Sequence, residues 1–282
     1  MCSTCGCGGA GEERESGHGH AHGHDHDHDH DHDHDHDHAH AHDHAHGHSH
    51  GHVHVVRPVG APLRIVELER DLLGKNDGLA AKNRLALRGS GTVALNLMSS
   101  PGSGKTTLLV RTLEHLRGAL LVGVVEGDQE TSLDAERIRS TGAPAVQVNT
   151  GSACHLDAAM VARAMHELPP LPGGVLFVEN VGNLVCPAAF DLGETKRVVI
   201  ASVTEGEDKP LKYPNMFARA DLLVVTKSDL LPHLSFDLPL FLRRAAEVKP
   251  GLESIVVSAK TGEGLDAWYA WIHRIRAEVG AP

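Results

Sequence analysis

The chain has 282 residues and a net charge of −11, and residues 1–56 carry −10 of it because they hold 11 acids against the single Arg14. The rest is nearly neutral, long enough to bury the core of one α/β domain, and too poor in Lys and Arg to bind nucleic acid through its phosphates. No apolar run reaches the roughly 18 residues that span a bilayer, and the first residues lack the apolar core of a signal peptide, which favours a cytoplasmic protein.

Three cysteines open the sequence, at Cys2, Cys5 and Cys7. Such crowded thiols form no spaced disulfide framework, and in a reducing compartment they more often bind metal. Together with the α-amino group or a backbone nitrogen they would give a soft four-ligand site that suits Ni²⁺. Exposed thiols without a ligand role are the alternative.

A histidine then occupies every second position from residue 18 to residue 54, mostly alternating with Asp, Ala and Gly. This composition cannot bury a core, so we expect residues 1–56 to be a disordered metal-binding tail that stores metal ions. A purification tag or a purely solvating tail is the alternative, and the tract alone does not identify the metal. The candidate ligands are His18, His20, His22, His24, His26, His28, His30, His32, His34, His36, His38, His40, His42, His44, His46, His48, His50, His52 and His54.

Residues 57–90 read as a helical lead-in, in which 63–88 form a helical hairpin or a broken helix punctuated by Gly74 and Gly78. In residues 91–282, apolar segments rich in Val, Leu and Ile alternate with longer segments, several of helical periodicity such as 106–116 and 133–139. This alternation predicts a mostly parallel sheet with helices on both faces. The expected strands are 92–98, 119–125, 145–148, 175–178, 198–203, 222–226 and 254–257.

A phosphate-binding loop follows the first expected strand, in the sequence SSPGSGKTT at 99–107. It matches G-x-x-x-x-G-K-[ST] except that Ser99 replaces the first glycine, and the strand–loop–helix context is met. Lys105 would reach the β and γ phosphates as the catalytic cation, and Thr106 would ligate Mg²⁺. The candidate phosphate-binding residues are Gly102, Ser103, Gly104, Lys105, Thr106 and Thr107.

Carboxylates near the γ-phosphate would complete the Mg²⁺ site. Asp128 and Glu179 follow or end two expected strands, at the sheet edge where α/β proteins bind ligands. Glu126 or Asp134 could take the same role, and any one of these acids could instead be a helix cap or a surface charge.

Two thiols lie within this domain: Cys154, which adjoins His155 at an expected helix start, and Cys186, seven residues after Glu179. Lone cysteines are often buried apolar residues. Their closeness along the chain to a loop that senses γ-phosphate favours a metal site that moves on nucleotide hydrolysis, and a two-fold dimer could pool thiols from both copies.

The base is indicated by TKSD at 226–229 and SAK at 258–260. Guanine presents two adjacent donors that Asp229 can accept, while Lys227 would lie along the base. GTPases usually have Asn where this chain has Thr226, a departure that weakens base contacts. After the last strand, Ser258, Ala259 and Lys260 would offer a backbone N–H to the guanine carbonyl. The ordered trio of motifs indicates GTP.

Further motifs make the chain resemble the hydrogenase nickel-incorporation GTPases of the HypB type, here with a His-rich N-terminal extension. They are MCSTCGC at 1–7, SSPGSGKT at 99–106, EGDQET at 126–131, NTGSACHLD at 149–157, ENVGNLVCP at 179–187, FDLGE at 190–194 and VTEGEDKPLKYP at 203–214. The resemblance covers essentially the whole sequence.

It implies a P-loop GTPase that dimerises and helps deliver Ni²⁺ to the large subunit of [NiFe] hydrogenase, with a nickel-binding partner of the HypA type. It further implies a tight nickel site at Cys2, Cys5 and Cys7 and a weaker nickel or zinc site at Cys154, His155 and Cys186. We expect slow intrinsic hydrolysis that acts as a switch, since the sequence offers no evident base or arginine finger. A pure metal store, or a GTPase that serves another nickel enzyme as urease accessory proteins do, are the alternatives.

Overall fold

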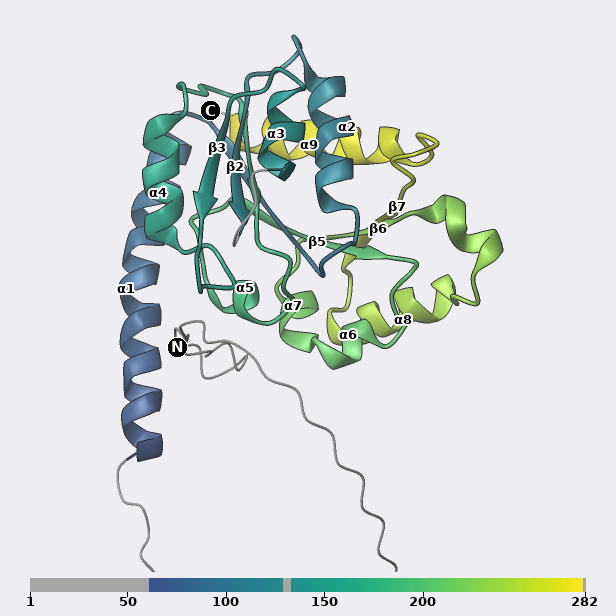
Figure 1. Cartoon of the computed structure of the whole chain (residues 1–282), viewed down its shortest axis with the longest axis horizontal. Helices are drawn as coiled ribbons and strands as arrows, with labels where there is room; N and C mark the ends of the chain where they lie inside the picture. Colours follow the sequence, from purple (N-terminus) through teal and green to yellow (C-terminus); the bar gives the residue numbers. More distant parts are fainter. Residues whose placement is uncertain (1–60, 129–132, 281–282) are drawn as a thin grey trace, which may run out of the picture. The chain divides into compact units, whose positions relative to one another are not determined.

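The computed structural model describes residues 61–128 and 133–280, with side chains from Arg70 onward (Figure 1). From Arg64 onward these residues belong to one compact unit. The expected sites at Cys2, Cys5 and Cys7 and along the histidine tract lie outside the described residues. None of the helices in the described part combines the length and apolar character that crossing a membrane requires.

A seven-stranded sheet forms the centre, and all of its strand pairs are parallel, in the order β3-β2-β4-β1-β5-β6-β7. The strands are β1 (Val93–Ser99), β2 (Val122–Asp128), β3 (Ala145–Asn149), β4 (Val175–Glu179), β5 (Lys196–Ser202), β6 (Leu222–Thr226) and β7 (Glu253–Val256). A parallel sheet needs both faces covered, which explains its nearly continuous apolar strands. The prediction of a parallel sheet between helical layers is confirmed.

Alternate residues of each strand point to opposite faces and pack against different helices. On β4, Val175 and Phe177 join the cluster formed by α2 (Lys105–Leu116), α3 (Leu133–Arg139) and α9 (Leu265–Gly280). Leu176 and Val178 face α4 (Ala158–Glu167) and the end of α1 (Ala61–Gly89) instead.

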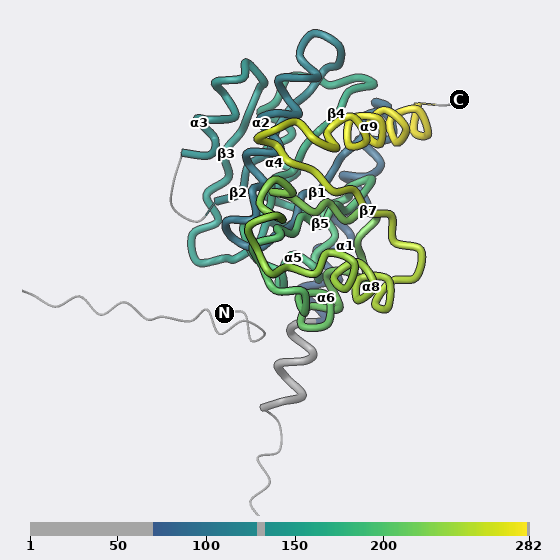
Figure 2. The backbone as a smooth tube through the Cα atoms, turned by 90° about the vertical axis from the view of Figure 1, so that its right-hand side faces the viewer, coloured from purple at the N-terminus to yellow at the C-terminus, as the bar shows by residue number. Residues whose placement is uncertain are grey.

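The second face continues under β5 and β6, where the short helices α5 (Cys186–Ala189) and α7 (Pro214–Ala218) and the longer α8 (Leu238–Val248) pack. The remaining short elements are α6 (Lys209–Lys212) and the 3₁₀ helix η1 (Ser228–His233). The turned view shows α8 and α9 on opposite sides of β7 (Figure 2). The strands thus lie between helical layers, and their carboxyl ends open onto the loops that follow them.

Helix α1 corrects one expectation: it runs unbroken through Gly74 and Gly78 instead of forming a hairpin or a broken helix. Each glycine costs a helix only about 1 kcal/mol relative to Ala. Against that cost, the buried residues Asn76, Ala80 and Leu87 recur at helical spacing on one face. Tertiary contacts along this face therefore outweigh the two glycines.

The second strand also differs from its prediction, because β2 begins at Val122 and ends at Asp128, three residues later than the apolar run. Its last residues pair with both neighbours, Glu126 with Glu179 of β4 and Asp128 with Asn149 of β3. Backbone pairing extends the strand into acidic sequence, so Glu126 and Asp128 belong to the strand and do not follow it.

Candidate nucleotide and metal sites

The loop between β1 and α2 has the curled backbone of a phosphate-binding loop. Gly102 has φ 71° and Gly104 has φ 91°, in the left-handed region that other residues rarely adopt. Gly104 also stands directly before α2, so the N–H groups of the first helical turn open onto the loop. Ser99, which replaces the first glycine of the motif, is the last residue of β1 and donates from Oγ to Ser100 O at 2.9 Å.

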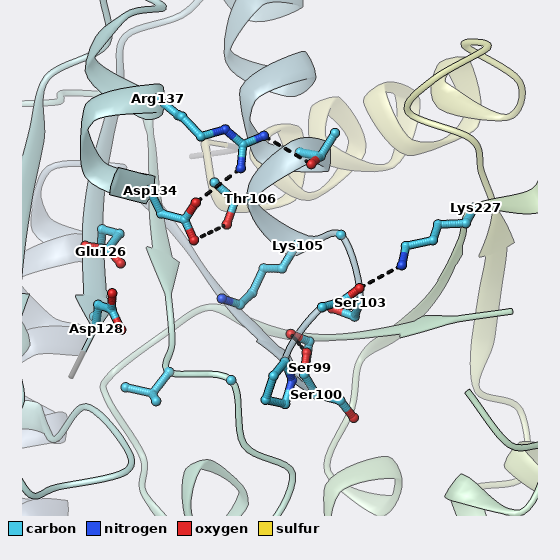
Figure 3. A pocket seen from close by; sticks show the side chains of 17 residues that line it. Ser99, Ser100, Ser103, Lys105, Thr106, Glu126, Asp128, Asp134, Arg137 and Lys227 are labelled. Atoms are coloured by element: carbon cyan, nitrogen blue, oxygen red, sulfur yellow. Dashed lines mark hydrogen bonds and ion pairs between the residues drawn. The ribbon is translucent and has the colours of Figure 1, made fainter. Parts of the chain in front are cut away.

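A cavity of about 550 Å³ lies against this loop (Figure 3). Its walls include the loop backbone, Glu126, Asp128 and Asp134, together with Gly182 from the segment after β4. A Cβ at position 182 would lie 3.1 Å from Pro101 Cα, so this segment rests directly on the phosphate loop. The Ser103 Oγ is buried and has no hydrogen-bond partner among the described residues. A loop lined by N–H groups with an unsatisfied hydroxyl is suited to phosphate oxygens.

One carboxylate joins the two functional side chains of the loop. Glu179 Oε1 accepts from Lys105 Nζ at 2.9 Å and from Thr106 Oγ1 at 2.6 Å. Asp134 Oδ2 accepts from the same threonine hydroxyl at 3.0 Å. Glu179 is only 1% exposed, so water does little to stabilise its negative charge. The ion pair with Lys105 stabilises it instead. Of the two preferred acids, Glu179 lies beside Thr106 and Asp128 lines the cavity, while the alternative acid Asp134 also bonds Thr106.

A second buried carboxyl, Glu126, pairs in register with Glu179 on the neighbouring strand and is 2% exposed. Burial raises the pKa of Glu126 to about 8, and the charges of Glu179 and Asp128 add to the rise. One carboxylate oxygen of Glu126 and one of Glu179 have no partner among the described groups. Unsatisfied carboxylate oxygens beside a threonine hydroxyl are the donor set that a hard divalent cation prefers, so these residues fit Mg²⁺.

The expected base-binding residues come together at the ends of β6 and β7, although they do not line the phosphate cavity, apart from Lys227. Ser258 Oγ donates to Asp229 Oδ1 at 2.6 Å, which fixes that carboxylate. Thr226 Oγ1 donates to Ser103 O at 2.5 Å, and Lys227 Nζ donates to Gly102 O at 2.7 Å. The loop that carries Asp229 is thereby tied to the phosphate loop. Ala259 and Lys260 follow Ser258 and are increasingly exposed.

The second expected site is compact: one ligand atom each from Cys154, His155 and Cys186 lies within 4.8 Å of the others. Cys154 Sγ is 4.0 Å from His155 Nδ1. Two ligands of one tetrahedral zinc ion stand about 3.3–3.8 Å apart, as its bond lengths of about 2.0–2.3 Å require. The three side chains therefore fit a thiolate- and imidazole-binding metal with little rearrangement, and a fourth position stays open.

The environment favours ligand chemistry at this cluster. Both thiols are buried, and the His155 ring stacks on Phe190 with centroids 3.9 Å apart. Burial lowers the pKa of His155, against the opposing effect of Asp157, so the neutral imidazole that binds metal is favoured. The helix-start prediction for Cys154 was wrong, because α4 begins at Ala158 and its N-cap is Asp157, which accepts from Met160 N at 2.7 Å.

Comparison with known proteins gives the family. Residues 93–256 match the family described as CobW/HypB/UreG, nucleotide-binding domain. The hydrogenase maturation factor HypB of Rhizobium leguminosarum bv. viciae is 60% identical over 209 residues, which cover 74% of this chain and 70% of that relative. The chain belongs to the HypB family of hydrogenase maturation factors.

Two solved HypB structures agree with this assignment. The crystal structure of HypB from Archaeoglobus fulgidus matches with a TM-score of 0.68 and 42% identity, covering 72% of this chain and all of that one. HypB from Helicobacter pylori, solved in complex with nickel, matches with a TM-score of 0.68 and 37% identity, covering 72% and 96%. The HypB fold is therefore a P-loop nucleotide-binding domain, as expected from the sequence.

In this HypB-type chain the sequence motifs missed two basic residues at the phosphate loop. Arg137 of α3 lines the cavity, pairs with Asp134 at 3.1 Å and donates to Thr107 Oγ1 at 3.2 Å. Lys209 donates to Ser100 Oγ at 3.2 Å. No local pattern marks Arg137, whereas Lys209 lies within the family motif VTEGEDKPLKYP and could have been identified from it.

Sequence reasoning also missed the polar face of α1. Asn76 Oδ1 accepts from Ala158 N at 2.9 Å, and Asn83 Nδ2 donates to Ala158 O at 2.8 Å and to Leu192 O at 3.0 Å. A Cβ at Gly193 would lie 2.5 Å from Ala80 O, so the helix packs directly on the 191–193 backbone. Helix α1 thus joins the start of α4 to the segment that follows α5.

Proposed function

We propose that this chain is a GTP-hydrolysing nickel metallochaperone that helps insert Ni²⁺ into the large subunit of [NiFe] hydrogenase. The observation that carries the proposal is the position of β4. The strand ends in Glu179, which contacts Lys105 and Thr106, and the segment beyond it leads within seven residues to Cys186, beside Cys154 and His155. A nucleotide site and a soft-metal site therefore share one short stretch of chain.

In this proposal the phosphates of GTP occupy the cavity against Gly102 to Thr107, and Asp229 accepts the two donors of guanine. Lys105 stabilises the negative charge of the transferring phosphoryl group while water attacks to give GDP and phosphate. Thr106, Glu179 and Asp128 would hold Mg²⁺, with Asp134 beside them, and the ion would neutralise charge on the phosphate oxygens. We assign no general base, so intrinsic turnover is slow and hydrolysis serves as a switch.

Nickel is the cargo in this proposal, and Cys154, His155 and Cys186 bind it, or zinc, as a transfer site. A two-fold dimer would supply further ligands to the open position. Cys2, Cys5 and Cys7 form a tighter nickel site, and the histidine tract stores additional ions. A nickel-binding protein of the HypA type and the hydrogenase large subunit are the proposed partners, in the cytoplasm. The nickel-bound HypB from Helicobacter pylori supports nickel as the cargo.

The test is nickel binding to the full chain with a competing chelator, in GDP or in a non-hydrolysable GTP analogue. We expect Cys154→Ser combined with Cys186→Ser to lower the nickel stoichiometry and to remove any dependence of affinity on the nucleotide. GTP hydrolysis by the same double variant should persist, since neither thiol lines the phosphate cavity. If the double variant binds nickel as the unmodified chain does, in both nucleotides, the transfer-site assignment is wrong.

A further inference from the structure

The segment after β4 contains a buried amide that bonds both chain segments on which the cluster residues lie. Asn180 directly follows Glu179 and is 1% exposed. Its Oδ1 accepts from two backbone N–H groups, Leu156 at 3.1 Å and Val181 at 3.0 Å. Its Nδ2 donates to Asn96 Oδ1 at 3.3 Å, and its own N–H donates to Leu97 O of β1 at 3.1 Å. The side chain is thus fixed to the sheet on one side and to a loop on the other.

The first of these N–H groups belongs to the residue after His155. Leu156 is fully buried, and its side chain packs against the backbone of Gly127, where a Cβ would lie 2.7 Å from Leu156 Cγ. Gly127 stands between Glu126 and Asp128 in β2, and Thr150 N donates to Asp128 O at 2.9 Å. The loop that carries Cys154 and His155 is therefore held by the ends of β2 and β4, the strands that carry Glu126, Asp128 and Glu179.

The second N–H group starts the segment that leads to Cys186. Val181 N shares the Asn180 oxygen, and the neighbouring Gly182 rests on Pro101 of the phosphate loop. Asn183 Nδ2 makes a longer bond of 3.4 Å to Cys154 O, and its Oδ1 accepts from Val185 N at 2.8 Å. One carboxamide oxygen thus joins the chain that bears Cys186 to the loop that bears the other two ligands.

We propose that Asn180 is the positioning residue through which the phosphate cavity controls the arrangement of Cys154, His155 and Cys186. This inference rests on the proposed nickel function. Phosphate would compete with Glu179 for Lys105, and Mg²⁺ would compete with Lys105 and Thr106 for the Glu179 carboxylate. A resulting shift of the Glu179 backbone moves the adjacent Asn180. Because Leu156 and Val181 share one acceptor, that movement changes the spacing of both ligand-bearing segments together. The interaction that links the two sites is then a pair of hydrogen bonds to one side-chain oxygen.

The experiment measures nickel binding at this cluster alone, in the full chain with Cys2, Cys5 and Cys7 changed to Ser. In that background the nickel–thiolate charge-transfer absorption reports only Cys154 and Cys186, because imidazole and carboxylate ligands of the tail do not produce it. Free nickel is buffered with a chelator, and the apparent Kd is compared between GDP and a non-hydrolysable GTP analogue. Coupled sites typically change each other's affinity about 5- to 150-fold.

We expect the Kd ratio between the two nucleotides to fall to about one in Asn180→Ala. The matched control is Asn96→Ala, which also removes a buried amide and a partner of Asn180 but leaves the two bonds to Oδ1, and it should keep the ratio. An unchanged ratio in Asn180→Ala overturns the inference and leaves the proposed function standing. A ratio of one in the background protein itself overturns the nucleotide-controlled metal site, and with it this inference.

Thermal unfolding checks that Asn180→Ala folds, and amide hydrogen exchange of the unmodified chain supplies an independent test if it does not. Replacing GDP by the GTP analogue should change exchange in residues 150–157 and 181–186 together, since both segments hydrogen-bond the same oxygen. A response in residues 181–186 with none in residues 150–157 would overturn the inference without any variant.

Discussion

The two ends of the nucleotide site differ in how well their polar groups are satisfied. At the ends of β2 and β4, Glu126 and Glu179 each keep a buried carboxylate oxygen without a partner in the described structure. At the ends of β6 and β7, by contrast, Asp229 accepts from Ser258, and Thr226 donates to the phosphate loop. The first region is arranged for a cation and phosphates that are not part of the chain, while in the second the side chains are already held in place by bonds within the chain.

This difference indicates at which end ligand binding can change the conformation of the protein. A carboxylate buried beside another is unfavourable until a cation joins it, so binding at the phosphate end relieves an existing cost and can shift the backbone. The residues at the ends of β6 and β7 are already held in position, so they can select the base without a conformational change. We therefore expect substitutions at the phosphate end to change rate and conformation, and substitutions at the other end to change the choice of base.

The largest effect should come from Lys105→Ala, which removes the cation that Glu179 and the phosphates share. We expect GTP hydrolysis to fall by about 10²–10³-fold, the usual loss when one charge-stabilising donor is removed. Steady-state release of phosphate measures it. Lys212→Ala is the control, since Lys212 is exposed and pairs with Asp208 away from the cavity. Hydrolysis within threefold of the unmodified rate would show that Lys105 does not serve catalysis.

Asp229→Asn should change the base that is bound. The amide would donate where the carboxylate accepts, so affinity for GTP should fall by about 10²-fold or more, while XTP, whose base carries a carbonyl at the same position, should bind better. Competition against a fluorescent GTP analogue provides the measurement. Asp237→Asn serves as the control, because Asp237 caps α8 and Asn caps helices equally well. Equal loss of GTP and XTP would contradict the assignment of Asp229 to guanine.

Glu126→Gln should alter how stability depends on pH. The pKa of Glu126 in the folded protein lies near 8, above its ordinary value of 4.5. The contribution of protonated Glu126 to the free energy of unfolding is therefore fully present at low pH and is lost as pH rises through about 8. Without nucleotide and Mg²⁺, the unfolding temperature of the unmodified chain should decline between pH 5 and pH 9, and that of the variant should decline less. Glu247→Gln replaces an exposed acid and should follow the unmodified chain. Parallel curves for Glu126→Gln and the unmodified chain would rule out a raised pKa.

The smallest effect is expected from Thr226→Val, which removes the hydroxyl bonded to Ser103 O. A hydrogen bond of this kind contributes about 1 kcal/mol, so the unfolding temperature should drop by about 2–4 °C and GTP affinity by about fivefold. Thr226→Ser keeps the hydroxyl and should behave as the unmodified chain does. A loss of GTP affinity as large as that of Asp229→Asn would mean that the base-binding residues at the ends of β6 and β7 depend on the phosphate loop far more than this single hydrogen bond indicates.

Local patterns made much of the fold predictable. The phosphate loop was recognisable because its glycines and Lys105 act within eight consecutive residues, and the seven strands because buried parallel strands are continuously apolar. The glycines of α1 misled the prediction, since a local preference of about 1 kcal/mol cannot reveal the tertiary contacts of Asn76 and Asn83.

The site was predictable only where it is contiguous or carried by a family motif. Nothing in the spacing of Cys186 and Cys154, which lie on different segments, shows that they meet, and only the resemblance implied it. The bond from Arg137 to Thr107 depends on how α3 packs beside α2, and the bond from Leu156 to Asn180 joins separate segments, neither of which composition and periodicity specify. The raised pKa of Glu126 follows first from its burial and then from its register opposite Glu179, neither of which the local sequence specifies.

The order of the sheet has a consequence for how the chain is made. Strand β1 pairs on one side with β4 and on the other with β5, which lie about 80 and 100 residues further along. At a synthesis rate of about 5–20 residues per second, the apolar segment from Val93 to Ser99 waits roughly 5–20 s on the ribosome for its second neighbour. Until β4 and then β5 are made, the phosphate loop lacks the strands that flank β1, so the nascent chain exposes an unpaired apolar strand during this interval.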